Sequence, residues 1–341
     1  MKVMDFLQIR VSVLLGEQPF VRDFFDAQGI LLDKSDSRTV EKLIFDLPDE
    51  SLEDLGIKRD QLVTDFVSFM EGMAVLTEDA GIKVRSLTVI GGHDKSGNTE
   101  NARLDLKPGD VVSIVGPTGS GKSRLLADIE WMADGDTPTG RKILINGETP
   151  DKNWRFSPEH KLVAQLSQNM NFVMDLSARE FVTMHAESRF IQNPNETVER
   201  ILEEANKLAG ETFEPDSPIT SLSGGQSRAL MIADTAFLSR SPIVLIDEIE
   251  NAGIDRKNAL ALLIREEKIV LMATHDPILA LMADRRVVIQ NGGIFAVLDT
   301  SRMERGNLTI LEEMDRKLLE LRNRLRTGGR IEDIEQEEHH A

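Results

Sequence analysis

The stretch "VVSIVGPTGSGKSRLLADIEWM", residues 111–132, decides the fold because it joins a short apolar run, a glycine-rich loop and an amphipathic segment. The apolar run predicts a buried strand, and the segment after the loop predicts a helix. The loop itself, "GPTGSGKS", fits the pattern G-x-x-x-x-G-K-[ST] between a strand and a helix, which is the context the pattern requires. We therefore predict a phosphate-binding loop and set aside a purely structural glycine-rich turn.

The residues of this loop suit phosphate binding for physical reasons. Glycines let backbone N–H groups wrap closely around phosphate oxygens, and the following helix adds the positive end of its dipole. We expect Lys122 to reach the β and γ phosphates of a nucleotide and the Ser123 hydroxyl to ligate Mg²⁺. The predicted nucleotide-binding residues of the loop are Gly116, Pro117, Thr118, Gly119, Ser120, Gly121, Lys122 and Ser123.

A second stretch, "VLIDEIENAGID" at 244–255, places four carboxylates at the end of an apolar run: Asp247, Glu248, Glu250 and Asp255. Their mutual repulsion is tolerable where a cation lies among them. An apolar strand that ends in an acid is typical of nucleotide-binding proteins, so Asp247 is predicted to hold Mg²⁺ through water, with Glu248 orienting or deprotonating the attacking water. Without the phosphate loop, a solvated acidic loop would be the better interpretation.

Composition limits the functional classes. The chain has 341 residues, 40% of them hydrophobic, no cysteine and a formal charge of −18. These features argue against a disulfide framework, a thiolate zinc site and nonspecific nucleic-acid binding. The run "VSVLL" near the N-terminus is too short for a signal peptide, and no apolar run reaches the roughly 18 residues of a membrane span. We expect a soluble cytoplasmic protein.

The chain is expected to contain three parts. Residues 1–80 read as helices, because Val63, Phe66, Met70 and Met73 recur at helical spacing. A helical domain that packs its own core is favoured there over a partner-docking face. Residues 81–302 alternate short apolar runs with helical stretches, as α/β proteins do, and about 170–222 forms an inserted helical subdomain. The predicted strands are 83–90, 111–115, 142–145, 162–164, 243–246, 269–272, 286–290 and 294–297.

The third part, 303–341, is predicted to be a C-terminal helix followed by an acidic tail. Its apolar residues step by 3, 4, 3 and 4, as in a coiled coil: Leu311, Met314, Leu318, Leu321 and Leu325. The stripe is short, so packing on its own domain is favoured over a coiled coil.

Between the two nucleotide motifs lies "LSGGQ", 222–226, and with it the chain resembles the ATP-binding cassette (ABC) ATPases over about residues 82–300. The other motifs follow in that family's order. Gln168 lies nine residues before Ser177, as the Q-loop glutamine does, and His275 in "MATHD" matches the switch histidine. "ENAGID" occupies the D-loop position and ends in Asp255.

The resemblance implies a P-loop ABC-type nucleotide-binding domain that binds ATP and Mg²⁺ and hydrolyses ATP. It implies that the helix opening at Ser223 binds the phosphate of a nucleotide held by another subunit, so two chains form a head-to-tail dimer on ATP binding. His275 would then contact the γ-phosphate, and Gln168 would contact Mg²⁺ and water. The residues that the resemblance implies to bind the nucleotide held by the other subunit are Ser223, Gly224, Gly225, Gln226 and Asp255.

Three features depart from transporter members of the family. Residues 82–115 lack the aromatic that usually stacks on adenine; only His93 lies near its place, and Trp154 or the N-terminal helices are the alternatives. The stretch "DEIENAGID" lacks the usual proline and carries one extra residue, as in soluble chromosome-maintenance relatives. The helix after "LSGGQ" is not Gln/Arg-rich. These departures favour a soluble ATPase.

Four functions follow from these observations. A soluble ABC ATPase that remodels an unknown protein partner is favoured. The alternative is the motor subunit of an ABC transporter whose membrane subunits are separate chains. A nonhydrolysing sensor fits poorly with Glu248, and a DNA-repair ATPase fits poorly with the net charge of −18.

Overall fold

The computed structural model describes residues 6–331 apart from 19, 55, 78–82, 156–160, 168–171, 190, 192 and 248–253. Three residues singled out above, Gln168, Glu248 and Glu250, lie outside the described residues, and so do most of the D-loop and the acidic tail. The chain divides into two compact units: Met1–Gly81 with Arg189–Asn193, and Ile82–Ser188 with Pro194–Ala341. Each is described by itself.

The first unit is helical and has a core of its own. Phe24 lies against Phe25 and Phe66 with ring centroids 5.2 and 5.4 Å apart, and Phe66 and Met70 are fully buried. Such aromatic contacts add to the free energy of burying apolar surface. The elements are η1 (Phe6–Gln8), α1 (Val11–Glu17), α2 (Phe20–Ala27), α3 (Val40–Asp46), α4 (Asp49–Asp54) and α5 (Arg59–Thr77).

The second unit contains two sheets. The larger has the order β5-β6-β7-β3-β8-β9, in which only β9 runs antiparallel to its neighbour. The smaller is antiparallel, with the order β2-β1-β4. The strands are β1 (Leu87–Ile90), β2 (Arg103–Leu106), β3 (Val111–Val115), β4 (Lys142–Ile145), β5 (Val163–Leu166), β6 (Ile243–Asp247), β7 (Ile269–Ala273), β8 (Arg285–Gln290) and β9 (Gly293–Asp299).

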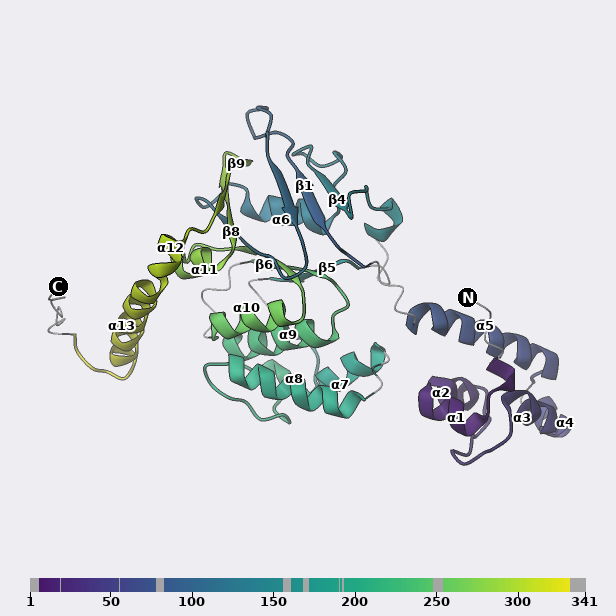
Figure 1. Ribbon diagram of the computed structural model, residues 1–341. Helices are drawn as coiled ribbons and strands as arrows, with labels where there is room; N and C mark the ends of the chain where they lie inside the picture. The colour runs from purple at the N-terminus through teal and green to yellow at the C-terminus, as the bar shows by residue number, and fades with distance from the viewer. Residues whose placement is uncertain are drawn as a thin grey trace. The chain divides into compact units, whose positions relative to one another are not determined.

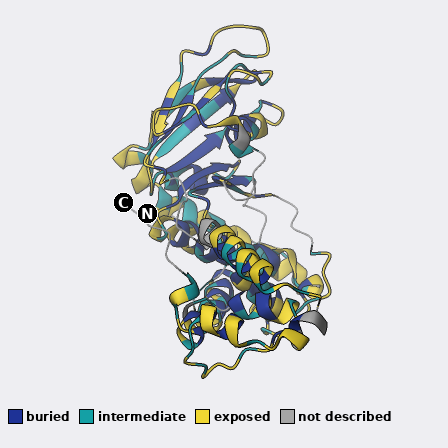
Figure 2. Ribbon diagram, turned by 90° about the vertical axis from the view of Figure 1, so that its right-hand side faces the viewer, coloured by how far each residue is buried: buried dark blue, intermediate teal, exposed yellow. Residues whose placement is uncertain are grey.

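Helix α6 (Lys122–Glu130) packs between the two sheets. Its Leu125, Leu126 and Ile129 belong to one buried cluster with residues of both sheets, such as Leu87 and Ile114. The central parallel strands are buried on both faces, as Figure 2 shows in dark blue. Parallel strands with both faces covered read as continuous apolar runs, which is why 111–115 and 269–273 were recognisable.

The remaining helices include a group of four that reaches the parallel sheet through two of its members. Helices α8 and α9 lie side by side with α7 and α10 beside them, and α11 contacts β3 (Figure 1). These elements are η2 (Lys152–Arg155), α7 (Ala178–Ser188), α8 (Pro194–Leu208), η4 (Ile219–Ser221), α9 (Gly224–Leu238), α10 (Arg256–Arg265), α11 (Pro277–Met282), α12 (Arg302–Gly306) and α13 (Leu308–Arg326).

The predicted α/β class with inserted helices, an N-terminal helical part and a C-terminal helix is confirmed. Two details differ. Strand β2 was not predicted, because its four residues "RLDL" are too few for their alternation of apolar and charged side chains to stand out. The stripe of α13 was expected to pack on its own domain, yet no residue of that helix is buried, and Met314 and Leu318 are more than half exposed.

In the described part of the chain, no helix is both long enough and apolar enough to cross a bilayer.

Candidate functional site

The loop between β3 and α6 has a backbone that only glycines adopt easily. Gly116, Gly119 and Gly121 have φ values of 153°, 74° and 111°. A Cβ atom on Gly116 would lie 2.4 Å from the carbonyl oxygen of Ile289, so a side chain cannot be accommodated there without a backbone shift. Backbone N–H groups at the start of a helix form an anion-binding site, so the loop fits the phosphates of a nucleotide.

Lys122 joins this loop to the end of β7. Its Nζ atom donates hydrogen bonds to the carbonyl oxygens of Gly116 at 2.9 Å and Pro117 at 3.3 Å. The same atom lies 3.1 Å from Nε2 of His275, the residue predicted to act as the switch histidine. A lysine ammonium group can only donate, so Nε2 of His275 is the acceptor and its proton is on Nδ1. Two residues 153 positions apart therefore meet at one point.

Ser123 and Asp247 also meet at this edge of the parallel sheet. The Oγ atom of Ser123 is 3.5 Å from Oδ2 of Asp247, the last residue of β6. Hydroxyl and carboxylate oxygens this close suit one Mg²⁺ ion. The described residues include no group of three or more His, Asp or Glu side chains that could hold a metal alone. The pair therefore fits an ion that takes its other ligands from nucleotide phosphates and water.

Two segments donate hydrogen bonds to the phosphate loop, and neither was predicted from the sequence to do so. The Lys95 Nζ atom donates to the carbonyl oxygen of Gly119 at 3.0 Å, and the Gly292 N–H group donates to that of Ser120 at 2.7 Å. Asp94 organises the Lys95 loop: hydrogen bonds from Asn98, from Asn291 and from the Ser96 backbone hold its pKa below the usual range. The polar loop near residue 93 thus shapes the nucleotide site.

A buried ion cluster centred on Arg141 supports α6. Arg141 is fully buried and donates to Glu100 at 2.6 and 3.0 Å, to Asp128 at 2.9 Å and to the Gly292 carbonyl at 2.8 Å. Asp128 lies on α6, and its Oδ1 atom has no hydrogen-bond partner within the described residues. The cluster ties the smaller sheet, α6 and the β8–β9 turn together.

The predicted signature helix α9 opens with a capping box. The Ser223 Oγ atom accepts from the Gln226 N–H group, and Gln226 Oε1 accepts from the Ser223 N–H group at 2.8 Å. Ser223 and Gly224 are exposed. No hydrogen bond recorded for the described residues joins Ser223 or Gln226 to the phosphate loop. The exposed helix start therefore faces solvent within one chain.

Asp255 caps α10 and fixes the end of the D-loop. Its carboxylate accepts from the backbone and side chain of Asn258 at 3.0 and 2.8 Å, and its N–H group donates to Leu208 of α8 at 2.8 Å. The next residue, Arg256, bridges Asp276, the residue after His275, and reaches Asp315 on α13 at 2.5 Å. One guanidinium group thus joins the start of α10 to the loop after β7 and to α13.

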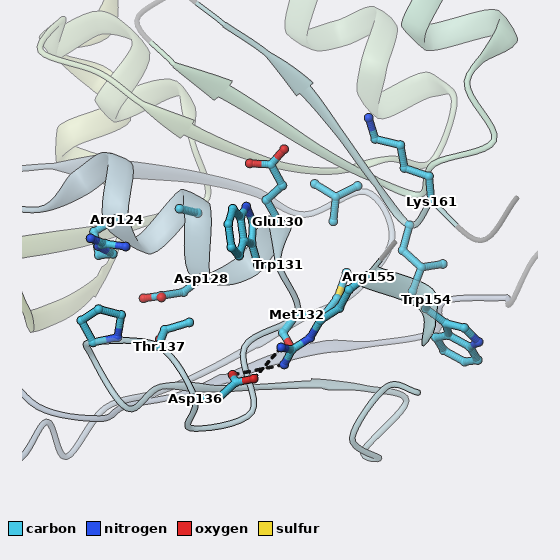
Figure 3. A pocket seen from close by; sticks show the side chains of 14 residues that line it. Arg124, Asp128, Glu130, Trp131, Met132, Asp136, Thr137, Trp154, Arg155 and Lys161 are labelled. Atoms are coloured by element: carbon cyan, nitrogen blue, oxygen red, sulfur yellow. Dashed lines mark hydrogen bonds and ion pairs between the residues drawn. The ribbon is translucent and has the colours of Figure 1, made fainter. Parts of the chain in front are cut away.

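A cavity of about 730 Å³ lies along one face of α6 (Figure 3). Trp131 at the C-cap of α6 is 61% exposed and lines it, together with Trp154 and Asp128. Arg155 closes one side, donating to Asp136 at 2.5 Å and to the Met132 carbonyl at 2.8 Å. Trp154 packs partly against the core of this unit. The lining of the cavity combines apolar side chains such as Leu162 and Val163 with charged ones such as Arg124 and Glu130.

Comparisons with known proteins agree with this geometry. Residues 99–251 match the family model described as ABC transporter. An uncharacterized ABC transporter ATP-binding protein of Methanocaldococcus jannaschii is 51% identical over 256 residues, which cover 74% of this chain and 98% of that protein. The ATP-binding protein TcyN of an L-cystine transport system of Escherichia coli is 30% identical, covering 56% of this chain and 80% of that protein.

Solved structures support the fold. The cbiO1 protein of Clostridium perfringens, described as part of an ABC transporter complex, matches with a TM-score of 0.50 and 20% identity, covering 67% of this chain and 94% of its own. The relatives above are ATP-binding proteins of transporters, so the comparisons do not support our preference for a non-transporter role and favour its alternative. With its phosphate loop, its converging lysine and histidine and a half-identical relative, the chain belongs to the ATP-binding cassette family and is an ATP hydrolase that binds Mg-ATP.

Proposed function

We propose that this chain is the ATP-binding motor subunit of an ABC transporter whose membrane subunits are separate chains. The observation that carries the proposal is that Lys122 meets His275 and Ser123 meets Asp247 at the C-terminal edge of the parallel sheet, in a chain whose relatives are ATP-binding proteins of transporters. This role would place the chain at the cytoplasmic face of a membrane, bound through its partners.

Each site residue has a proposed task. The glycine-rich loop binds the phosphates through its N–H groups, and Lys122 moves from the Gly116 and Pro117 carbonyls to phosphate oxygens. Ser123, Asp247 and Gln168 hold Mg²⁺, which when bound neutralises charge on the phosphate oxygens. Glu248 orients or deprotonates the attacking water, and His275 donates a hydrogen bond to the γ-phosphate.

The exposed start of α9 acts on a second copy of the chain. Its N–H groups are not used by the chain's own phosphate loop, and the capping box holds them in place. We propose that Ser223, Gly224, Gly225 and Gln226 bind the triphosphate held by the partner, with Asp255 beside them, in a head-to-tail dimer with two ATP molecules. ATP binding closes this dimer and hydrolysis opens it.

The cavity along α6 is the proposed docking site of a membrane subunit. Trp131 and Trp154 line this cavity, and Trp131 offers it an exposed apolar surface. Helix α6 joins Trp131 to Lys122 over about 13 Å, at 1.5 Å per residue. A rigid helix of this length transmits closure at the phosphates to a segment seated in the cavity.

The test uses Glu248→Gln with Mg-ATP, which should block hydrolysis and hold the dimer closed. We expect this variant, purified from detergent-solubilised membranes, to retain one stoichiometric integral membrane protein. Trp131→Ala in the same background should lose that protein and still dimerise with ATP, whereas Met303→Ala, which removes an even more exposed apolar side chain on α12, should keep it. Hydrolysis by Glu248→Gln at the wild-type rate would contradict the role of Glu248. A soluble partner in place of the membrane protein would restore the remodelling role.

A further inference from the structure

Helix α13 carries an apolar stripe that its own chain leaves uncovered. Met314, Leu318 and Leu325 are 57%, 52% and 57% exposed. The other two members of the stripe, Leu311 and Leu321, are half-buried. The helix is 19 residues long, about 28 Å at 1.5 Å per residue. A contiguous exposed stripe of this length is typical of an interaction surface.

The polar side of the helix, in contrast, is held against the chain. Asp315 is bridged by Arg256 of α10 at 2.5 Å, and Glu312 lies 3.7 Å from Lys257. Helix α13 also contacts α11 and α12 (Figure 1). These contacts orient α13 with its acidic first half towards α10. Because these contacts hold α13 against its own domain, the stripe always faces away from α10 in the same direction.

The spacing of the stripe suits pairing with an identical helix. Steps of 3 and 4 residues place its members on one seam, as at the a and d positions of a coiled coil. The stripe is also symmetric: Leu311 and Leu325 are each seven residues from Leu318. A two-fold axis through Leu318 would place Leu311 opposite Leu325 of a second copy and Met314 opposite Leu321. Every member of the stripe then faces another apolar side chain.

The charges select an antiparallel arrangement. Residues 308–315 of α13 carry three acidic side chains and no basic one, two of the acids being also paired with α10, whereas residues 316–326 carry five basic side chains and one acidic. A parallel pair would place acid against acid and base against base, which repel. An antiparallel pair places the acidic half of each helix against the basic half of the other. The helix as a whole has five basic and four acidic side chains, so it approaches a copy of itself without the repulsion expected of a chain with a net charge of −18.

We propose that α13 is a self-association surface: two copies of the chain pair through antiparallel α13 helices centred on Leu318. This interface is separate from the ATP-dependent dimer proposed above and needs no nucleotide. Because it is isologous, with the same patch on both copies, it closes at two chains. It holds two motor subunits together while no ATP is bound between them.

The first test is sedimentation velocity on nucleotide-free protein carrying Lys122→Ala, which removes the contribution of bound ATP. We expect a dimer at micromolar concentrations. Leu318→Glu, which buries a charge at the axis, should weaken that dimer at least tenfold. Asn323→Glu, which adds the same charge to the same helix off the stripe, should leave it unchanged. A monomer at 100 µM, on the order of a weak but specific affinity, or an equally tight dimer of Leu318→Glu, would overturn the proposal.

The second test reports orientation without disturbing the fold, because the chain has no cysteine of its own. Oxidised Leu318→Cys should cross-link to itself, since disulfides need Cα atoms roughly 4.4–6.8 Å apart. Leu311→Cys should cross-link to Leu325→Cys in a mixture and not to itself. Self-cross-linking of Leu311→Cys would contradict the antiparallel arrangement. The ATP-dependent dimer of Glu248→Gln is measured separately, so failure of either proposal leaves the other standing.

Discussion

The Nζ atom of Lys122 lies 3.1 Å from the Nε2 atom of His275. The first residue belongs to the helix that follows β3 and the second to the loop that follows β7, and these strands are neighbours in the sheet. Both side chains therefore point to where the γ-phosphate of a nucleotide is proposed to lie. The contact makes the lysine and the switch histidine parts of a single site.

Lys122→Ala should bind ATP about tenfold to a hundredfold more weakly, because a hydrogen bond to a charged group contributes roughly 1.5–3 kcal/mol. Titration calorimetry with Mg-ATP measures the affinity directly. Lys107→Ala, which removes a lysine on the exposed turn before β3, is the matched control and should bind as the parent does. Unchanged affinity in Lys122→Ala would argue against the phosphate loop as the nucleotide site.

Arg256→Ala should lower kcat by about tenfold, which corresponds to roughly 1.4 kcal/mol. Arg256 bridges Asp276, next to His275, and directly follows Asp255, so its loss separates the start of α10 from the residues beside His275. Steady-state ATPase assays should show the loss in kcat with a smaller change in KM. Lys257→Ala, which removes an exposed neighbour whose only described ion pair spans 3.7 Å, should leave the rate within a factor of two. Equal rates for the two variants would refute the assignment.

Arg141→Met should destabilise the nucleotide-binding unit by about 3–5 kcal/mol, because Glu100 and Asp128 would remain buried without a compensating charge. Urea denaturation followed by tryptophan fluorescence measures the change, since both tryptophans lie in this unit. Arg103→Met removes an arginine of similar size from an exposed pair with Asp105 and should cost less than about 1 kcal/mol. If the two variants unfold at the same urea concentration, the Arg141 cluster contributes nothing to stability.

The free energy of unfolding should depend on pH through Glu304, which lies on α12. Its hydrogen bond with Arg286, followed by those with Ser301, lowers the pKa of Glu304 to about 2. A carboxyl group whose pKa is lower in the folded state stabilises the fold fully above its unfolded pKa and loses that contribution as the pH falls towards the folded value. The urea midpoints of the wild type and Glu304→Gln should therefore differ at pH 6 and converge between pH 4.5 and 2. A constant difference would mean that the carboxylate charge is irrelevant.

Local patterns predicted the phosphate loop and the central strands well. The eight residues "GPTGSGKS" contain all the glycines, the lysine and the serine that define the motif. Strands that are buried on both faces appear in the sequence as uninterrupted apolar runs. The acid at the end of β6 could be identified for the same reason. The proximity of Ser123 to Asp247 was expected only because both were predicted to hold one Mg²⁺, and the role of His275 beside Lys122 followed only from the resemblance to a known family, since 124 and 153 residues separate the partners.

The missed features depend on long-range contacts. Arg141 looks like a surface residue in "TGRKILI", and only its partners 41 and 13 residues away make its burial possible. Lys95 lies in a polar loop whose link to Gly119 spans 24 residues. The α13 stripe was recognised from its spacing, but spacing alone could not tell whether its own domain would cover it.

The aromatic core of the first unit bears on how that unit can change. Phe24, Phe25 and Phe66 pack against one another in a cluster of buried residues that all belong to the first unit. Substitutions at sites that share no contacts act independently on stability. Changes in this aromatic cluster can therefore accumulate without altering the phosphate loop, so the two units are able to diverge at different rates.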